Sequence, residues 1–117
     1  MHDDAQLFFK SFYSSVLGGI TTHQSLMMVP IDDHMVHRGH AVFDTAIVAG
    51  GHVYQLEQHL DRFLKSASGA RIAPSMHRSQ MRRIILDTAA ASQCESGVFL
   101  VLVYHICLLY TSDAADE

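Results

Sequence analysis

Three histidines stand at every third position of the stretch DDHMVHRGH, residues 32–40. Neutral imidazole is the commonest metal ligand, and two carboxylates precede it, so His34, His37 and His40 are candidate metal ligands. On a helix the third side chain would drift roughly 60° further around than the second, and on a strand His37 would point away from the other two. Only a loop could gather all three. We therefore expect no dedicated metal site and read the stretch as a polar connection into a strand.

Composition limits the class of protein. About half of the 117 residues are apolar (49%), which is enough for one domain with a core. The net charge of −4 argues against nucleic-acid binding. The longest apolar run, residues 98–104, is far shorter than the roughly 20 residues that cross a bilayer. Two cysteines make neither a disulfide framework nor a zinc set, and the start MHDDAQ does not resemble a secretory signal, so we expect a protein inside the cell.

The first third of the chain gives weak structural signals. Residues 5–19 carry apolar groups at both helical and alternating intervals, and we expect a strand near Tyr13. Gly18 and Gly19 indicate a turn. The segment SLMMVPI, residues 25–31, is expected to be extended and to suit a sheet edge, because Pro30 lacks a backbone donor.

The rest of the chain gives stronger signals. Residues 41–49 and 52–56 favour β-structure on both sides of a Gly-Gly link, which predicts a hairpin. Residues 56–72 and 77–93 then show the apolar spacing of two amphipathic helices, and residues 98–106 read as a strand buried on both faces. Strands, two helices and a further strand predict an α+β fold with a mostly antiparallel sheet.

The succession IDDHMVHRGHAVFDTAIVAGGHVYQLEQHLDRFLKSA resembles the N-terminal domain of the class IV (fold type IV) pyridoxal-phosphate-dependent aminotransferases. The likeness lies in a strand of the form V-F-D, a hairpin and a helix that begins E-x-H-L-D-R, all in order. It covers roughly residues 10–95 and is greatest for the branch of D-amino-acid transaminases and aminodeoxychorismate lyases. The resemblance implies the N-terminal domain of that fold, with the C-terminal domain missing.

The resemblance assigns roles to individual residues. Arg62, the arginine of E-x-H-L-D-R, would hold the phosphate of pyridoxal 5'-phosphate, and a guanidinium near a helix start suits phosphate oxygens. The substrate pocket would contain Phe43 and Thr45, which share one face of their strand, together with Asp44 and His40. Ordinary alternatives are a solvated helix residue for Arg62, core packing for Phe43 and Thr45, and a cross-strand partner for Asp44.

The family's catalytic lysine, which forms a Schiff base with the cofactor, would come from the second domain. The chain has only Lys10 and Lys65, and neither matches it, so we expect no catalytic residue in these 117 residues and no turnover by them alone. The implied substrate is an amino acid or an amino-chorismate-type molecule, and the implied assembly of the full-length protein is a homodimer. The implied location is the cytoplasm or a plastid.

The last eleven residues, CLLYTSDAADE (107–117), resemble the translation of a transposon-end sequencing adapter. We therefore expect residues 1–106 to be an authentic but truncated N-terminal domain. Residues 107–117 are expected to be a sequencing artefact. The alternative to the enzyme is a free-standing small domain that binds a ligand, or a metal through His34, His37 and His40.

Overall fold

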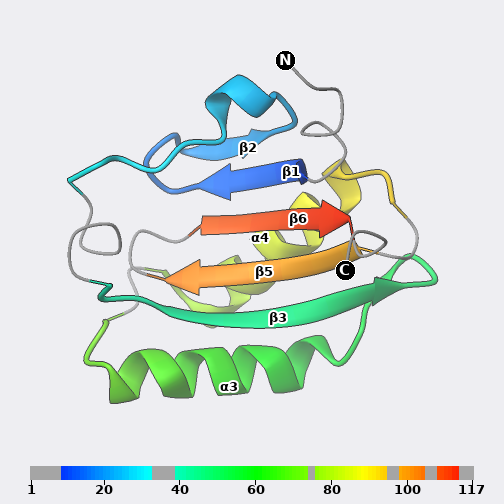
Figure 1. Ribbon diagram of the computed structural model, residues 1–117. Helices are drawn as coiled ribbons and strands as arrows, with labels where there is room; N and C mark the ends of the chain where they lie inside the picture. The colour runs from blue at the N-terminus through cyan, green and yellow to red at the C-terminus, as the bar shows by residue number, and fades with distance from the viewer. Residues whose placement is uncertain (1–8, 33–38, 74–75, 95–97, 105–107, 114–117) are drawn as a thin grey trace.

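The computed structural model describes residues 9–32, 39–73, 76–94, 98–104 and 108–113, the last two ranges as backbone only. Its elements are, in chain order, β1 (Phe9–Ser14), β2 (Gly19–Thr21), the 3-10 helix η1 (Gln24–Leu26), β3 (Val42–Ala49), β4 (His52–Val53), α3 (Leu56–Gly69), α4 (Arg78–Ala91), β5 (Val98–Tyr104) and β6 (Leu108–Asp113). The strands form one sheet in the order β2-β1-β6-β5-β3-β4, and every pairing is antiparallel. Two helices on such a sheet confirm the predicted α+β fold (Figure 1).

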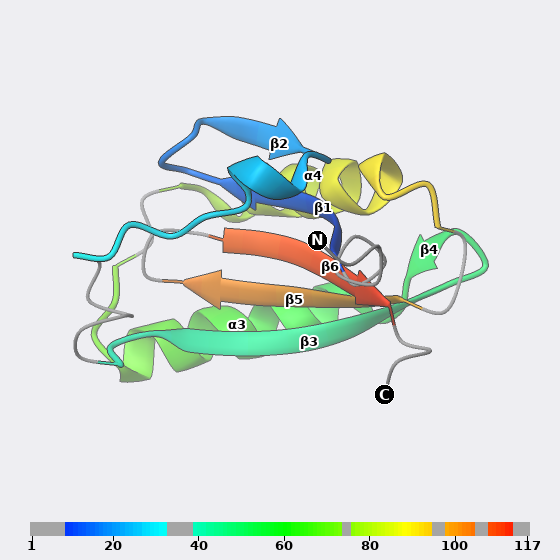
Figure 2. The same cartoon turned by 45° about the horizontal axis from the view of Figure 1, so that its top comes forward.

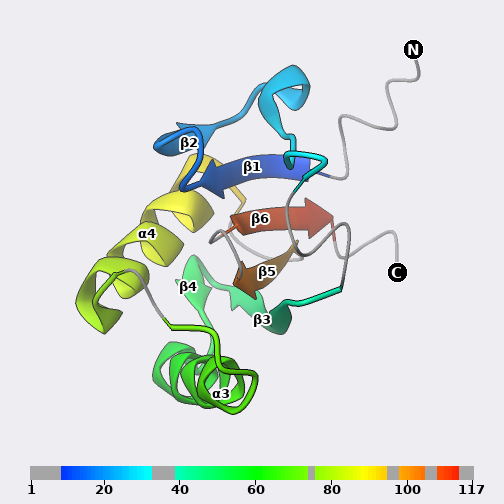
Figure 3. The ribbon, with the colours of Figure 1, turned by 90° about the vertical axis from the view of Figure 1, so that its left-hand side faces the viewer.

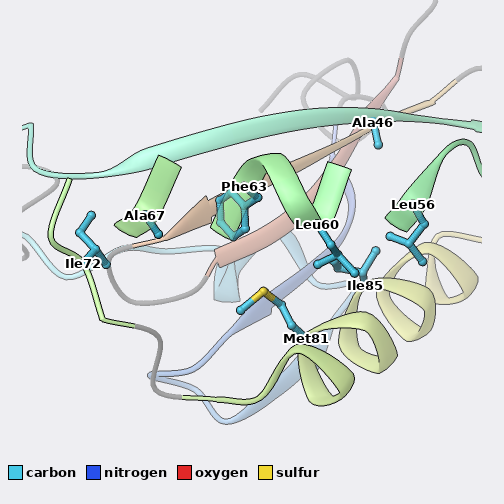
Figure 4. Packing of buried hydrophobic residues seen from close by; sticks show 8 residues of the cluster. All are labelled: Ala46, Leu56, Leu60, Phe63, Ala67, Ile72, Met81 and Ile85. Carbon is cyan, nitrogen blue, oxygen red and sulfur yellow. The ribbon is translucent and has the colours of Figure 1, made fainter. Parts of the chain in front are cut away.

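Both helices lie on the same face of the sheet (Figure 3), where α3 runs along β3 and α4 lies behind the centre. Apolar spacing explains this placement. Leu60, Phe63 and Ala67 recur at helical intervals on α3 and are fully buried, and Met81 and Ile85 do the same on α4. In Figure 4 these side chains point toward one another beneath the sheet, so the core is a layer between helices and sheet.

The hairpin β3–β4 is confirmed, with Gly50 and Gly51 both at positive φ, a conformation in which a side chain would be strained. Its second strand is shorter than predicted, because the chain turns at Gln55, also at positive φ, and α3 starts at Leu56. The strand near Tyr13 and the turn at Gly18 are confirmed as well.

The expectation for residues 25–31 is wrong in part. Gln24–Leu26 form a turn of 3-10 helix, and residues 27–30 pair with no strand among the described residues. The apolar side chains of this segment are not packed against the sheet, since Leu26, Met28 and Ile31 are exposed. Apolar composition alone therefore did not predict pairing here.

The strand predicted at residues 98–106 is present as β5 and lies between β3 and β6, in the body of the sheet (Figure 2). Whether its side chains are buried on both faces falls outside what the structure describes. β6 occupies residues 108–113 and pairs with β1 and β5. No helix among the described residues has the length and hydropathy to cross a membrane.

Candidate functional site

Asp44 is a carboxylate on the helix-facing side of β3. Alternate residues of this strand are buried, and Ala46 and Val48 share the buried face with Asp44. A charge in that position is costly unless it is paired. The pairing partners come from α3, which packs on this face.

His59 and Arg62 stand three residues apart on α3, so both side chains can reach the same neighbour on one face of the helix. The Arg62 guanidinium donates from Nη2 to Oδ1 of Asp44 at 2.8 Å. Nδ1 of His59 lies 3.1 Å from the other carboxylate oxygen, Oδ2, and 3.0 Å from Nη2 of Arg62. The three side chains thus form one cluster between sheet and helix, which we call the Asp44 cluster.

Hydrogen-bond chemistry restricts this cluster. Arg62 can only donate, so Nδ1 of His59 would have to accept in order to bond with it. Asp44 as a carboxylate can only accept, so the same nitrogen would have to donate to it. One nitrogen cannot do both at once. When Nδ1 carries the proton, His59 and Arg62 both donate to Asp44. The two donor nitrogens are then close to each other but not hydrogen-bonded.

Electrostatics agree with an ionised carboxylate at Asp44. Burial raises its pKa, but the hydrogen bonds from Arg62, His59 and the Thr45 backbone, with the electrostatic effect of His59, together lower it by more, so the pKa lies below the ordinary value of 3.8. The side chain is 11% exposed, and that of His59 is 16% exposed. Asp44 is therefore a fixed negative charge against which Arg62 is held.

Arg62 itself is largely open to solvent, with 64% of its side chain exposed. Its hydrogen bonds to described residues are made by Nη2, and none is made by Nε or Nη1. A guanidinium bonded to a carboxylate through one nitrogen keeps further N–H donors for an oxyanion such as a phosphate. By the chemistry of its donors, the site therefore fits the phosphate of pyridoxal 5'-phosphate.

Arg62 lies near the middle of α3 and not at its start. The residue is six positions after the first residue of α3, Leu56, which is about 9 Å along the axis at 1.5 Å per residue. That the unpaired backbone donors of the first turn act together with the guanidinium stays a prediction.

The other predicted pocket residues do not join the Asp44 cluster. Phe43 and Thr45 point to the opposite face of the sheet, where no described helix lies, and Phe43 is 73% exposed. His40 is also exposed, and its Nε2 lies 3.1 Å from the carbonyl oxygen of Ala70, just beyond α3. The structure thus separates Asp44, which faces the helices, from Phe43 and Thr45. The partner of Asp44 is a helix, not the neighbouring strand.

The metal hypothesis concerns residues that are only partly described. His34 and His37 lie outside the described residues, as does Arg38. Within the part of the chain that the structure describes, no three histidine, cysteine or acidic side chains are grouped as metal ligands would be. Lys65 is exposed on α3, and Lys10 is half-buried on β1.

A cleft of about 470 Å³ opens elsewhere, between the β3–β4 hairpin and the C-terminal half of α4. Val53, Leu86 and Cys94 are among the residues that line it, and none of the predicted site residues does. The candidate site is therefore an exposed arginine on a surface and not an enclosed pocket of these residues.

His59 was not among the site residues predicted from the sequence. A signal was present. Asp44 interrupts the buried alternation of β3, and a histidine and an arginine three residues apart follow on the next helix. A buried acid followed by two cationic partners at helical spacing indicates a cluster that neutralises the acid.

Comparison with known families decides the identity. The family model described as amino-transferase class IV matches residues 41–115, which include the whole Asp44 cluster. The chain belongs to the class IV aminotransferases. A curated class IV relative, the chloroplastic D-amino-acid transaminase of Arabidopsis thaliana, is 52% identical over 89 residues, which are 76% of this chain and 24% of the relative.

Solved structures agree with the assignment. The fold IV transaminase CpuTA1 of Curtobacterium pusillum is 25% identical and superposes with a TM-score of 0.67 over 81% of this chain and 37% of that one. A hypothetical aminotransferase of Mycobacterium tuberculosis in its PLP-bound form, 21% identical, gives a TM-score of 0.75 over 88% of this chain and 39% of that one, and shows the shared fold. This class IV aminotransferase chain thus spans about a quarter to two fifths of the length of the proteins it matches.

Proposed function

We propose that these residues are the part of a pyridoxal-phosphate-dependent class IV aminotransferase that holds the cofactor's phosphate. The observation that carries the proposal is the state of Arg62: its Nη2 is bonded to a buried carboxylate, and its side chain is nevertheless largely exposed to solvent. Family membership supplies the cofactor, and the donor chemistry of Arg62 supports the residue. When bound, pyridoxal phosphate supplies the electron sink for amino-group chemistry.

Each residue of the cluster has a distinct part in this proposal. Arg62 binds the phosphate through N–H groups that Asp44 does not occupy. Asp44 holds Nη2, which limits the rotation of the guanidinium and balances part of its charge before the phosphate arrives. His59 donates to the second oxygen of Asp44 and so fixes the carboxylate plane. Asp44 is thus a positioning residue and not a substrate contact.

Phe43 and Thr45 form the other half of the proposal. They lie on the exposed face of β3, and we propose that this face and His40 line the substrate pocket once the missing part of the enzyme packs there. Large exposed apolar groups on that face, Phe43 and Ile47, support a covered surface in the complete protein. The amino-acid substrate would lie between these side chains and the cofactor.

The identity of the substrate is proposed from the curated relative. Its name specifies D-amino-acid transamination, and at 52% identity we favour that reaction over the lyase reaction of aminodeoxychorismate lyases. The same name specifies the chloroplast, so of the two expected locations, cytoplasm and plastid, we favour the plastid. We further propose that the full-length enzyme is a homodimer.

The 117 residues should not catalyse transamination on their own, because neither Lys10 nor Lys65 corresponds to the family's lysine. A coupled assay of the purified chain with D-alanine, 2-oxoglutarate and pyridoxal phosphate should give no more pyruvate than the assay without protein. Saturable turnover would refute this and would make one of the two lysines catalytic.

The origin of residues 107–117 also remains a proposal. Of these, Leu108–Asp113 form β6, and the family match runs to residue 115. Backbone pairing tolerates many sequences, and Leu-Leu-Tyr-Thr favours β-structure, so a foreign segment can fill a strand position. Re-sequencing the transcript without a transposon library should show a different continuation after about residue 106. The same eleven codons in independent material would refute the artefact.

The role of Arg62 is tested by replacement in the full-length protein. Arg62→Ala should weaken pyridoxal-phosphate binding by about 1.5 to 3 kcal/mol, which is roughly 10- to 150-fold in Kd, because a charged hydrogen-bond donor is lost. Titration of the apoprotein, followed by the cofactor's absorbance, measures this. Arg83→Ala is the matched control, since Arg83 is exposed on α4 and pairs only with Asp87 among the described residues. Equal affinity of the Arg62 variant and the wild type would remove the proposed role.

A further inference from the structure

Two pairs of like charges face each other across the two helices. Glu57 and Asp61 stand one turn apart on α3, and Arg78 and Arg82 stand one turn apart on α4. Like charges at this spacing destabilise an isolated helix by a few tenths of a kcal/mol. The same unfavourable spacing occurs between two acidic residues on α3 and between two basic residues on α4. Among the described residues, each pair is neutralised by the pair on the other helix.

The contacts between the two pairs are dense. Arg78 donates from Nη2 to Oε1 of Glu57 at 2.9 Å and to its backbone carbonyl at 3.1 Å, and from Nη1 to Asp61. Arg82 donates from Nε to Oε2 of Glu57 at 2.7 Å. Arg78 thus forms three hydrogen bonds with the first turns of α3, and one of them is to the main chain. We call these four side chains the helix clamp.

The clamp differs from an ordinary surface ion pair. An isolated exposed pair contributes little, since two long side chains must be immobilised for one contact. Here one guanidinium bridges two carboxylates, and one carboxylate accepts from two guanidinium groups. The hydrogen bonds from Arg82 and Arg78 lower the pKa of Glu57, as expected for a carboxylate that stays ionised in the network.

The clamp acts on the helix that carries Arg62. Asp61 and Arg62 are neighbours in sequence, so one points toward α4 and the other toward Asp44 on β3. The apolar contact of α3 through Leu60 and Phe63 has no directional preference and permits small rotations about the helix axis. Directional hydrogen bonds to the clamp on one side and to Asp44 on the other remove that freedom.

We propose that the helix clamp, through Arg78, is a positioning device for Arg62 and sets the affinity of the proposed phosphate site. The proposal rests on the proposed function of Arg62. Loss of the clamp lets α3 rotate about its axis, which moves the Arg62 guanidinium away from its aligned position. No group of the clamp touches the phosphate, so Arg78 is a positioning residue.

The test uses the full-length protein and pyridoxal phosphate. Arg78→Ala should raise the Kd about three- to tenfold, whereas Arg83→Ala, on the same helix but outside the clamp, should leave it unchanged. Asp61→Asn, which keeps the size of the side chain, should raise the Kd in the same direction and serves if Arg78→Ala does not fold. Thermal unfolding of each variant shows whether stability alone has changed.

A double substitution separates positioning from general weakening. If Arg78 acts through Arg62, Arg78→Ala should have no further effect on the Kd when Arg62→Ala is already present. An equal additional loss in the double variant would overturn the proposal, as would a lower melting temperature with an unchanged Kd for Arg78→Ala and Asp61→Asn. A Kd unchanged by Arg62→Ala itself would instead refute the proposed function.

Discussion

The buried carboxylate of Asp44 links the strand to the helix that carries the proposed phosphate-binding arginine. Its two oxygens each face a cationic or donor group, at 2.8 Å for Arg62 and 3.1 Å for His59. Replacing either partner would leave one oxygen of this carboxylate without its donor in a site of low exposure, which is costly. The cluster therefore stabilises the fold as well as the position of Arg62.

The lowered pKa of Asp44 makes part of this stability depend on pH. A carboxyl whose folded pKa is depressed contributes stability that is fully present above its ordinary value of 3.8 and is lost as the pH falls through the lower folded value. Asp44→Asn should thus lower the free energy of unfolding by about 1.5 to 3 kcal/mol near neutral pH, and the difference from the wild type should shrink below about pH 4.

Urea unfolding between about pH 2 and pH 7 measures this difference. Asp87→Asn is the control, because Asp87 pairs with Arg83 on the exposed surface of α4, and its effect should stay within roughly 0.5 kcal/mol. A wild-type advantage over Asp44→Asn that is the same at every pH would mean that the carboxylate charge does not stabilise the fold.

The sequence alone could predict Arg62 as a phosphate ligand. It could not predict the side chains that position Arg62. Arg62 lies in a recognisable pattern of residue types, and its chemistry toward phosphate follows from the guanidinium alone. The pairing with Asp44 spans 18 residues and depends on which face of β3 meets α3, which is a tertiary property. Sequence therefore grouped Asp44 with its strand neighbours Phe43 and Thr45, although alternation places them on opposite faces.

At the level of elements, the predictions succeeded where local chemistry is decisive. The Gly-Gly link predicts a hairpin because both residues adopt positive φ there. The two helices follow from apolar spacing, and α3 and α4 begin and end within a few residues of the predicted bounds. The prediction of an extended edge segment at residues 25–31 was wrong in part for the opposite reason. It assumed that apolar residues are buried in the fold, and several of these are exposed.

The helix clamp shows the same limit of local reasoning. Like charges one turn apart on a helix are locally unfavourable, and their reason becomes visible only when α3 and α4 pack side by side. Such locally inconsistent spacing on two neighbouring helices is a useful sign of an interaction between them. It also suggests that sequence changes in α4 can alter a site on α3.

At the scale of the whole molecule, the two α-helices lie on one face of the sheet (Figure 3). The other face of β3 carries exposed Phe43 and Ile47. Soluble proteins rarely leave large apolar groups together on a surface without a partner. The chain also spans only 24% of the curated relative. Both observations support a surface that is completed by another part of the enzyme.

The fold class and the family could be predicted from the sequence because ordered patterns over roughly 85 residues were present in it. The substrate could not, because the strand residues proposed to contact it are exposed and do not by themselves define the shape of a pocket. Fold alone leaves the chemistry open, and the site must supply it.

The most direct test of the central claim is the structure of the full-length protein with pyridoxal phosphate bound. The account predicts that Nε or Nη1 of Arg62 lies within hydrogen-bond distance of a phosphate oxygen, about 2.7 to 3.2 Å, while Nη2 still contacts Asp44. A phosphate held by other residues, with the Arg62 guanidinium turned into solvent, would contradict it.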